Sequence, residues 1–117
     1  MPSTETEFIA AADATLSMIG LALDAALETG NADVDWNVND GILEIECGDG
    51  SKIIVNRHVP NRELWVAARA GGFHFRAEGG QWRDTRSGDD LAAVLARLLR
   101  AQGALSLTLP PLAAPAD

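Results

Sequence analysis

Two periods of apolar residues divide the chain into helical and extended stretches. Between residues 4 and 28, apolar side chains recur at spacings of three and four, which indicates an amphipathic helix with one apolar stripe: Phe8, Ala12, Leu16, Ile19, Leu23 and Leu27. Thr4 followed by Glu7 has the form of a capping box. A second stripe faces away from the first and is expected to contact water: Asp13, Ser17, Gly20, Asp24 and Glu28.

From residue 32 the period changes to two, which indicates β-strands. Val34, Trp36 and Val38 alternate with polar residues. Five further short strands are expected around residues 42–47, 52–56, 63–69, 73–78 and 82. Asn39-Asp40-Gly41, Asp49-Gly50, Gly71-Gly72 and Gly79-Gly80 form tight turns between them, so successive strands should be antiparallel neighbours.

A second helix follows the strands. Ser87 is the expected N-cap, and Gly103 ends the helix. Its apolar stripe consists of Leu91, Val94, Leu95, Leu98 and Leu99. Leu105, Leu107 and Leu109 then alternate with polar residues and form either a short strand or an extended segment against the helices. Residues 1–109 are expected to form a single domain, with 110–117 as a flexible C-terminal tail.

The order helix, strands, helix predicts an α+β fold. Two roughly parallel helices with one apolar stripe each can cover one face of a single antiparallel sheet of five to six strands, giving a two-layer αβ sandwich. The other sheet face is then open to water. Outward positions include Asn56, Trp65, His74 and Arg76, and a tryptophan beside an arginine is typical of an interaction hot spot. The alternatives are that a loop covers Trp65 or that the register is shifted by one residue.

Composition narrows the class of protein. Hydrophobic residues make up 47 % of the 117 residues, enough for a core and too many for a disordered acidic tail. The apolar runs are too short for a membrane span, and the N-terminus lacks the basic region of a secretory signal, so a cytoplasmic protein is expected. The single cysteine, Cys47, excludes an intramolecular disulfide and is expected in the core, while His58 is expected in a solvated loop.

Charge is distributed unevenly along the chain. The net charge is −8, and the acidic residues of the first half precede Lys52, the first basic residue. This asymmetry predicts a negative pole that attracts cations or a basic partner and repels nucleic acid, unless the acids only form a solvated face. No nucleophile elbow, glycine-rich phosphate loop or HExxH motif is present, so the chain is not expected to be an enzyme.

An ordered set of motifs resembles the bacterial frataxin family. Asp40-Gly-Ile-Leu and Asp49-Gly-Ser-Lys-Ile-Ile-Val-Asn-Arg resemble its second and third strands, and Pro60 followed by Leu64-Trp65-Val-Ala resembles its fourth. Gly71-Gly72-Phe-His-Phe and Trp82-Arg-Asp-Thr-Arg-Ser-Gly resemble the next hairpin and the entry to the second helix. The resemblance covers roughly residues 7–103, and it implies the frataxin-like sandwich described above.

The resemblance also implies a role in iron–sulfur cluster assembly. It implies weak surface binding of Fe²⁺ or Fe³⁺ along an acidic ridge, without an organic cofactor. The ridge would bind a cysteine desulfurase and modulate cluster synthesis in an iron-dependent way. Carried over by position, the metal-binding residues are Glu7, Asp13, Asp24, Glu28, Asp33 and Asp35, and the partner-binding residues are Glu44, Glu46, Asn56, Arg57 and Trp65.

The alternative function is a weak iron carrier or donor without a direct regulatory role. The expected partners are the cysteine desulfurase and an iron–sulfur scaffold protein, with neither nucleic acid nor membrane, and the expected state is a monomer or iron-dependent oligomers. The chain departs from the family because its ridge is thin between Asp24 and Glu28, with Glu44 and Glu46 as additional carboxylates. The resemblance thus favours docking to a basic partner over tight iron binding.

Overall fold

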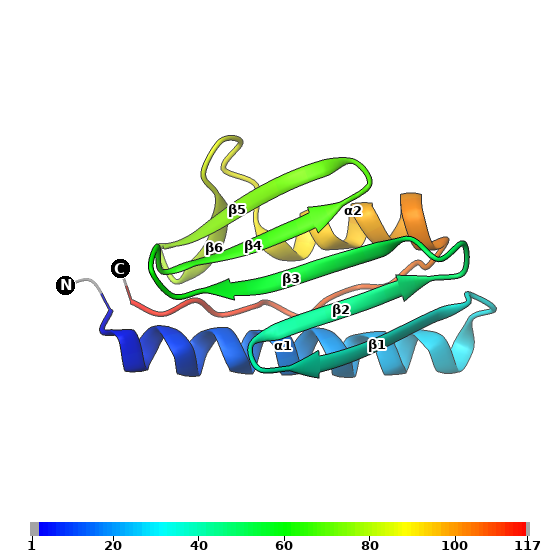
Figure 1. The fold of residues 1–117 in the computed structure, drawn as a ribbon, viewed down its shortest axis with the longest axis horizontal. Coiled ribbons are helices and arrows are strands. Elements are labelled where there is room, and N and C mark those ends of the chain that lie inside the picture. Colours follow the sequence, from blue (N-terminus) through cyan, green and yellow to red (C-terminus); the bar gives the residue numbers. More distant parts are fainter. Residues whose placement is uncertain (1–2, 117) are drawn as a thin grey trace.

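The protein folds into two layers, one of helices and one of strands. The structure is a computed structural model that describes residues 3–116. The elements follow one another as α1 (Glu5–Thr29), β1 (Val34–Asn39), β2 (Ile42–Cys47), β3 (Lys52–His58), β4 (Glu63–Ala68), β5 (Gly71–Glu78), β6 (Gln81–Asp84) and α2 (Leu91–Gly103). The strands form one antiparallel sheet in the order β1-β2-β3-β4-β5-β6. Both helices cover the same face of this sheet (Figure 1), so the predicted α+β sandwich is confirmed.

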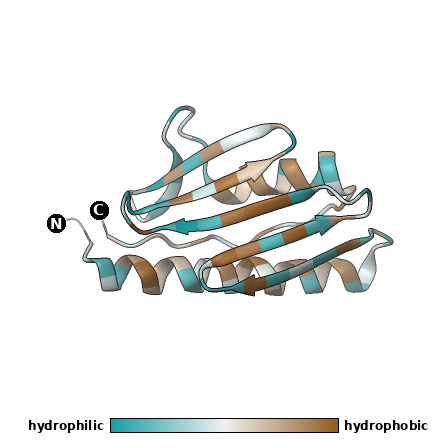
Figure 2. Ribbon diagram, in the orientation of Figure 1, coloured by the Kyte–Doolittle hydropathy of each residue, from teal (hydrophilic) through white to brown (hydrophobic). Residues whose placement is uncertain are grey.

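Strand alternation places the apolar side chains between the two layers. Along β1 and β2 apolar and polar positions alternate, as the change of colour in Figure 2 shows, and along β3 burial alternates although its centre is apolar on both faces. The largest buried side chain, Trp82 of β6, packs edge-on against Phe8 of α1 at a centroid distance of 6.0 Å. Its indole N–H donates to Thr15 Oγ1 at 3.0 Å, so its polar atom is satisfied inside the core. These contacts join α1, the first element of the fold, to β6, the last strand of the sheet.

The start of α1 agrees with the capping box expected from the sequence. Glu7 N–H donates to Thr4 Oγ1 at 3.1 Å, and Thr4 N–H donates to Glu7 Oε1 at 2.9 Å. These hydrogen bonds lower the pKa of Glu7, because they stabilise its ionised form. One of the six predicted ridge carboxylates therefore already has a structural role at the helix terminus.

The start of α2 differs from the prediction. The N-cap is Asp90, whose carboxylate accepts from Ala93 N–H at 2.7 Å, and not Ser87. Ser87 lies in the preceding turn, where Asp84 Oδ1 accepts from Arg86 N–H at 2.8 Å. Ser and Asp are both good N-cap residues, but Ser87 belongs to the turn after β6, so the helix begins after the later candidate, Asp90.

The segment after α2 lies between the two helices as an extended chain and forms no regular strand (Figure 1). Leu105, Leu109 and Leu112 are buried in the core. Ala114 N–H donates to Gly80 O at 3.0 Å, which ties the segment to the β5–β6 turn. We refer to residues 104–114 as the strap. The expected flexibility of residues 110–117 concerns motion and stays a prediction.

An 18-residue window of α1 has a mean hydropathy of 1.5, so this helix is long and apolar enough to cross a membrane by length and composition alone, whereas the apolar runs were expected to be too short. In the structure its inner stripe belongs to the core instead, because Phe8, Leu16 and Leu23 are at most 1 % exposed. Membrane insertion would remove this stripe from the sheet that it covers. The helix is thus used as the core helix of a globular fold.

Candidate interaction surfaces

Three of the six predicted ridge carboxylates are engaged within the fold and lie apart along α1. Glu7 closes the capping box at the first turn. Asp13 pairs with Arg57 of β3 at 2.6 Å. Asp24 accepts from the indole N–H of Trp36 at 2.8 Å. Each of these carboxylates therefore has a partner that a bound cation would have to displace or share.

Trp36 fixes β1 against α1 through a close contact with Gly20. A Cβ atom at Gly20 would lie 2.5 Å from Cη2 of Trp36, so only glycine leaves room for the indole. The ring packs on the helix backbone and directs its N–H to Asp24, one turn further along α1. The stripe of α1 that was expected to contact water is therefore partly covered by β1, and Gly20 in that stripe is buried.

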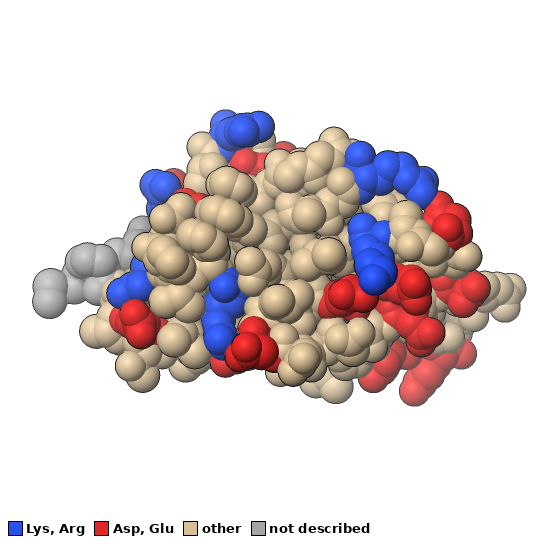
Figure 3. Space-filling model, viewed as in Figure 1, with Lys and Arg blue, Asp and Glu red and all other residues tan. Residues whose placement is uncertain are grey.

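The other three ridge carboxylates, Glu28, Asp33 and Asp35, lie where α1 ends and β1 begins beside β2. Asp35 and Glu46 stand directly opposite each other in the β1–β2 register, on the open face of the sheet. Figure 3 shows acidic atoms over the right-hand ends of these strands. We define the acidic patch as Glu28, Asp33, Asp35, Glu44 and Glu46, none of which is buried.

One cation reduces the charge of the acidic patch. Lys52 Nζ lies 2.9 Å from Glu44 Oε1, and the hydrogen bond and charge of Glu44 raise the pKa of Lys52. Within the described part of the chain neither Asp35 nor Glu46 forms an ion pair, although Lys52 stands opposite Glu46 in the β2–β3 register. Like charges directly opposite in a sheet are destabilising, so the pair weakens the fold and favours an external cation or basic group.

The described residues contain no group of three or more His, Cys, Asp or Glu side chains arranged to hold one metal ion. The carboxylates of the acidic patch are spread over a surface instead. Oxygen donors without a shared centre suit weak binding of hard cations and do not select among them.

The open face of the sheet carries an aromatic stack that the sequence prediction missed. The Trp65 indole is sandwiched between His58 at 3.6 Å and His74 at 4.3 Å, with interplanar angles of 8° and 6°. His58 was expected in a solvated loop, but it is the last residue of β3 and is half-buried. Because β3 is longer than predicted, His58 falls on the same face as Asn56 and Trp65. The prediction of an outward Trp65 is confirmed.

Glu63, two residues before Trp65 on the same face of β4, supports this stack. Glu63 is 4 % exposed, and its carboxylate accepts from Trp65 Nε1 at 2.9 Å and from Arg76 at 3.0 Å. Burial raises the pKa of Glu63, but the hydrogen bonds from Trp65 and Arg76 outweigh it and bring the pKa below its ordinary value. Glu63 is therefore an ionised group that orients the edge of the indole.

Arg57 does not share the open face with Asn56 and Trp65. Strand alternation turns its side chain to the helix side, where it pairs with Asp13 and is 19 % exposed. Its grouping with the open-face residues is therefore wrong in orientation. Asn56, by contrast, lies directly opposite Trp65 in the β3–β4 register. The open face thus presents Asn56 beside the aromatic stack.

Cys47 is buried at 3 % exposure, as expected of a core residue. Burial raises the pKa of its thiol, which disfavours the reactive thiolate. Together, these features describe a small acidic α+β protein that presents one acidic patch and one aromatic surface, both suited to macromolecular contacts.

Comparison with known proteins identifies the family. A family model described as a frataxin-like domain matches residues 1–104. The chain is 47 % identical over 108 residues to the iron-sulfur cluster assembly protein CyaY of Cupriavidus metallidurans, covering 92 % of this chain and 97 % of that protein. It is also 47 % identical to the CyaY protein of Ralstonia nicotianae, covering 92 % of this chain and 96 % of that protein. The chain belongs to the frataxin family.

Solved structures agree with this assignment. A frataxin from Psychromonas ingrahamii superposes with a TM-score of 0.82 at 29 % identity, covering 91 % of this chain and 97 % of that chain. A trimeric frataxin from the yeast Saccharomyces cerevisiae, complexed with ferrous iron, superposes with a TM-score of 0.70 at 21 % identity, covering 86 % and 87 % of the two chains. At that identity the second likeness supports the fold alone.

Proposed function

We propose that this protein is an accessory protein of iron–sulfur cluster assembly that docks its acidic patch on a basic surface of a cysteine desulfurase and modulates cluster synthesis in an iron-dependent way. The names of the CyaY relatives support the pathway. The observation that carries the docking proposal is the pair Asp35 and Glu46, placed directly opposite each other on an open strand face.

Unbalanced charge on the acidic patch favours a basic partner. Two carboxylates held opposite each other repel, and a partner arginine between them would convert that repulsion into attraction. Charges spread over a surface accelerate encounter and set orientation, and ions screen them within about 8 Å at physiological salt. Binding should therefore weaken steeply as ionic strength rises.

In this proposal iron is either an ion that the protein transfers or a signal that changes its docking. Weakly bound Fe²⁺ at the acidic patch would neutralise part of its charge and so change the docking of the desulfurase. The spread of the carboxylates favours this role over that of an iron carrier, because three of the six expected ridge residues are engaged within the fold. A carrier or donor role remains the alternative.

The open face would contact an iron–sulfur scaffold protein through Asn56 and the His58–Trp65–His74 stack. A planar aromatic group with fixed orientation loses little conformational freedom on binding, which favours its use as an anchor. We further propose that the protein is a cytoplasmic monomer in the absence of iron and that it has no catalytic turnover of its own.

The test is desulfurase turnover with and without this protein, across iron concentrations and at low and high salt. In the patch variant, Asp33→Asn, Asp35→Asn and Glu46→Gln remove three charges. In the matched control variant, Glu5→Gln, Glu78→Gln and Asp89→Asn remove three exposed charges elsewhere. We expect the patch variant to lose the effect while the control keeps it. Equal effects of the two variants, or affinity that does not change with salt, would refute docking through the patch.

The role of iron is tested separately by NMR. Titration of the protein with Fe²⁺ should broaden or shift amide signals of the patch residues, and the patch variant should lose this response. If iron leaves those amides unmoved while desulfurase binding persists, the protein docks without an iron signal.

A further inference from the structure

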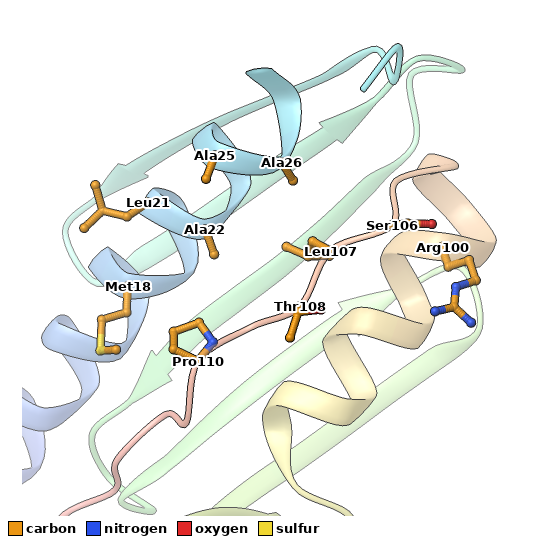
Figure 4. Close-up of a pocket in the computed structure, with 10 residues that line it drawn as sticks. All are labelled: Met18, Leu21, Ala22, Ala25, Ala26, Arg100, Ser106, Leu107, Thr108 and Pro110. Atoms are coloured by element: carbon orange, nitrogen blue, oxygen red, sulfur yellow. The ribbon is translucent and has the colours of Figure 1, made fainter. Parts of the chain in front are cut away.

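A groove on the helical side of the molecule has no role in the proposed function. It lies between α1 and the strap, has a volume of about 660 Å³ and is open to solvent. Figure 4 shows its wall on α1, its floor along the strap and Arg100 of α2 on the opposite side. The groove faces away from the open sheet face, so a partner on the sheet leaves it accessible.

The outer side of α1 is more apolar than a solvated helix face requires. Leu21 is 68 % exposed and Met18 is 36 % exposed, and both line the groove. They are two of the four large hydrophobic side chains that are exposed among the described residues. Only 39 % of the most apolar window of α1 is buried. Exposed apolar side chains gathered in one groove mark an interaction surface.

The charge around the groove is opposite to that of the whole chain. Arg100 is the charged residue in the groove lining, and Arg97 lies one turn earlier on the exposed side of α2. Neither guanidinium has an ion pair within the described part of the chain. On a protein with net charge −8, an unpaired arginine in the lining of an apolar groove, with a second arginine one turn away on the same helix, favours an anionic occupant.

We propose that this groove binds an amphipathic α-helix of a partner protein that carries acidic residues along one edge. Ala22, Ala25 and Ala26 form a low wall, which lets a helix backbone approach closely. Arg97 and Arg100 are three residues apart and so match carboxylates that repeat at each turn of a helix. An open groove buries one face of a helix, whereas a small anionic amphiphile needs a site that encloses most of its surface.

The test uses a synthetic helical peptide of about four turns with a Leu/Ala stripe and glutamates along one edge. A matched peptide carries lysines in place of the glutamates. Each peptide is titrated into the full-length ¹⁵N-labelled protein, and chemical shifts are followed at the groove residues. We expect the glutamate peptide to shift amides of α1, the strap and α2, and to bind about tenfold more tightly than the lysine peptide.

Three variants make the result specific. Arg97→Glu with Arg100→Glu should reverse the preference between the peptides. Arg86→Glu, an exposed substitution in the β6–α2 turn, should leave the preference unchanged. Ala25→Arg should block both peptides by filling the groove from an exposed position. Circular dichroism and the Tm establish that each variant is folded.

The proposal is overturned by any of three results. The first is that neither peptide shifts the groove amides. The second is tighter binding of the lysine peptide to the wild-type protein, as the net charge alone would favour. The third is that the groove amides respond to laurate or to protein concentration while the glutamate peptide leaves them unchanged, since the occupant would then be an amphiphile or a second copy of this chain.

Discussion

Glu63→Gln tests how the open face is held in place. Glu63 is 4 % exposed, and its carboxylate accepts hydrogen bonds from Trp65 and Arg76. A hydrogen bond to a charged group contributes about 1.5–3 kcal/mol. The Arg76 side chain is 66 % exposed, so water screens that bond and its share falls to about 1 kcal/mol or less. Glutamine keeps an oxygen for the indole N–H. We therefore expect the variant to lose about 1–2 kcal/mol of unfolding free energy at pH 7.

The pH dependence follows from the lowered pKa of Glu63. In the unfolded chain a glutamate titrates near pH 4.3, and in the fold its pKa lies lower. The stabilisation is therefore present above the unfolded pKa and is lost as the pH falls through the folded pKa. Glutamine does not titrate, so the difference in stability between wild type and variant should shrink below about pH 4.

The assay is urea unfolding followed by far-UV circular dichroism, repeated from pH 7 to about pH 3.5 where both proteins remain folded. Glu78→Gln is the matched control, because Glu78 is an exposed glutamate on the neighbouring strand β5. Ionised Glu63 does not stabilise the fold if Glu63→Gln lowers the unfolding free energy by the same amount at every pH, or by no more than Glu78→Gln does.

Four further substitutions test the packing. Asp90→Ala should lower the unfolding free energy by about 1 kcal/mol and Ser87→Ala by less than half of that, as measured by urea unfolding; the reverse order would contradict the position of the N-cap. Gly20→Ala should displace the Trp36 indole and change the near-UV circular dichroism, and an unchanged spectrum would contradict the close contact. Leu112→Ala should cost about 2 kcal/mol if the strap is docked and almost nothing if residues 110–117 are flexible, with hydrogen exchange as an independent measurement.

The fold was largely predictable because its rules are local. Alternation alone put Val55 and Val66 toward the helices and Trp65 toward the open face, and tight turns set the order of the strands. The helix limits also followed from local chemistry, apart from the choice between Ser87 and Asp90. That choice depended on how many residues the preceding turn required, which the residue types do not specify.

The side-chain contacts of the candidate surfaces were less predictable. The stack on Trp65 required His58 to belong to β3, and a boundary error of two residues concealed it. The bond from Trp36 to Asp24 depends on how closely β1 approaches α1, which is a matter of packing and not of periodicity. The strap was expected either as a short strand or as an extended segment against the helices, and the structure shows the second. Its apolar spacing alone did not decide between the two.

The docking of the strap also has a consequence for the order of events during translation. Thr15 of α1 lies 3.5 Å from its acceptor, the carbonyl of Ala113, which follows 98 residues later. At about 5–20 residues per second, the ribosome adds Ala113 some 5 to 20 s after Thr15. During that interval α1 has been synthesised, but the strap that covers part of it has not. A nonsense mutation late in the coding sequence would therefore expose the earliest helix of the nascent chain.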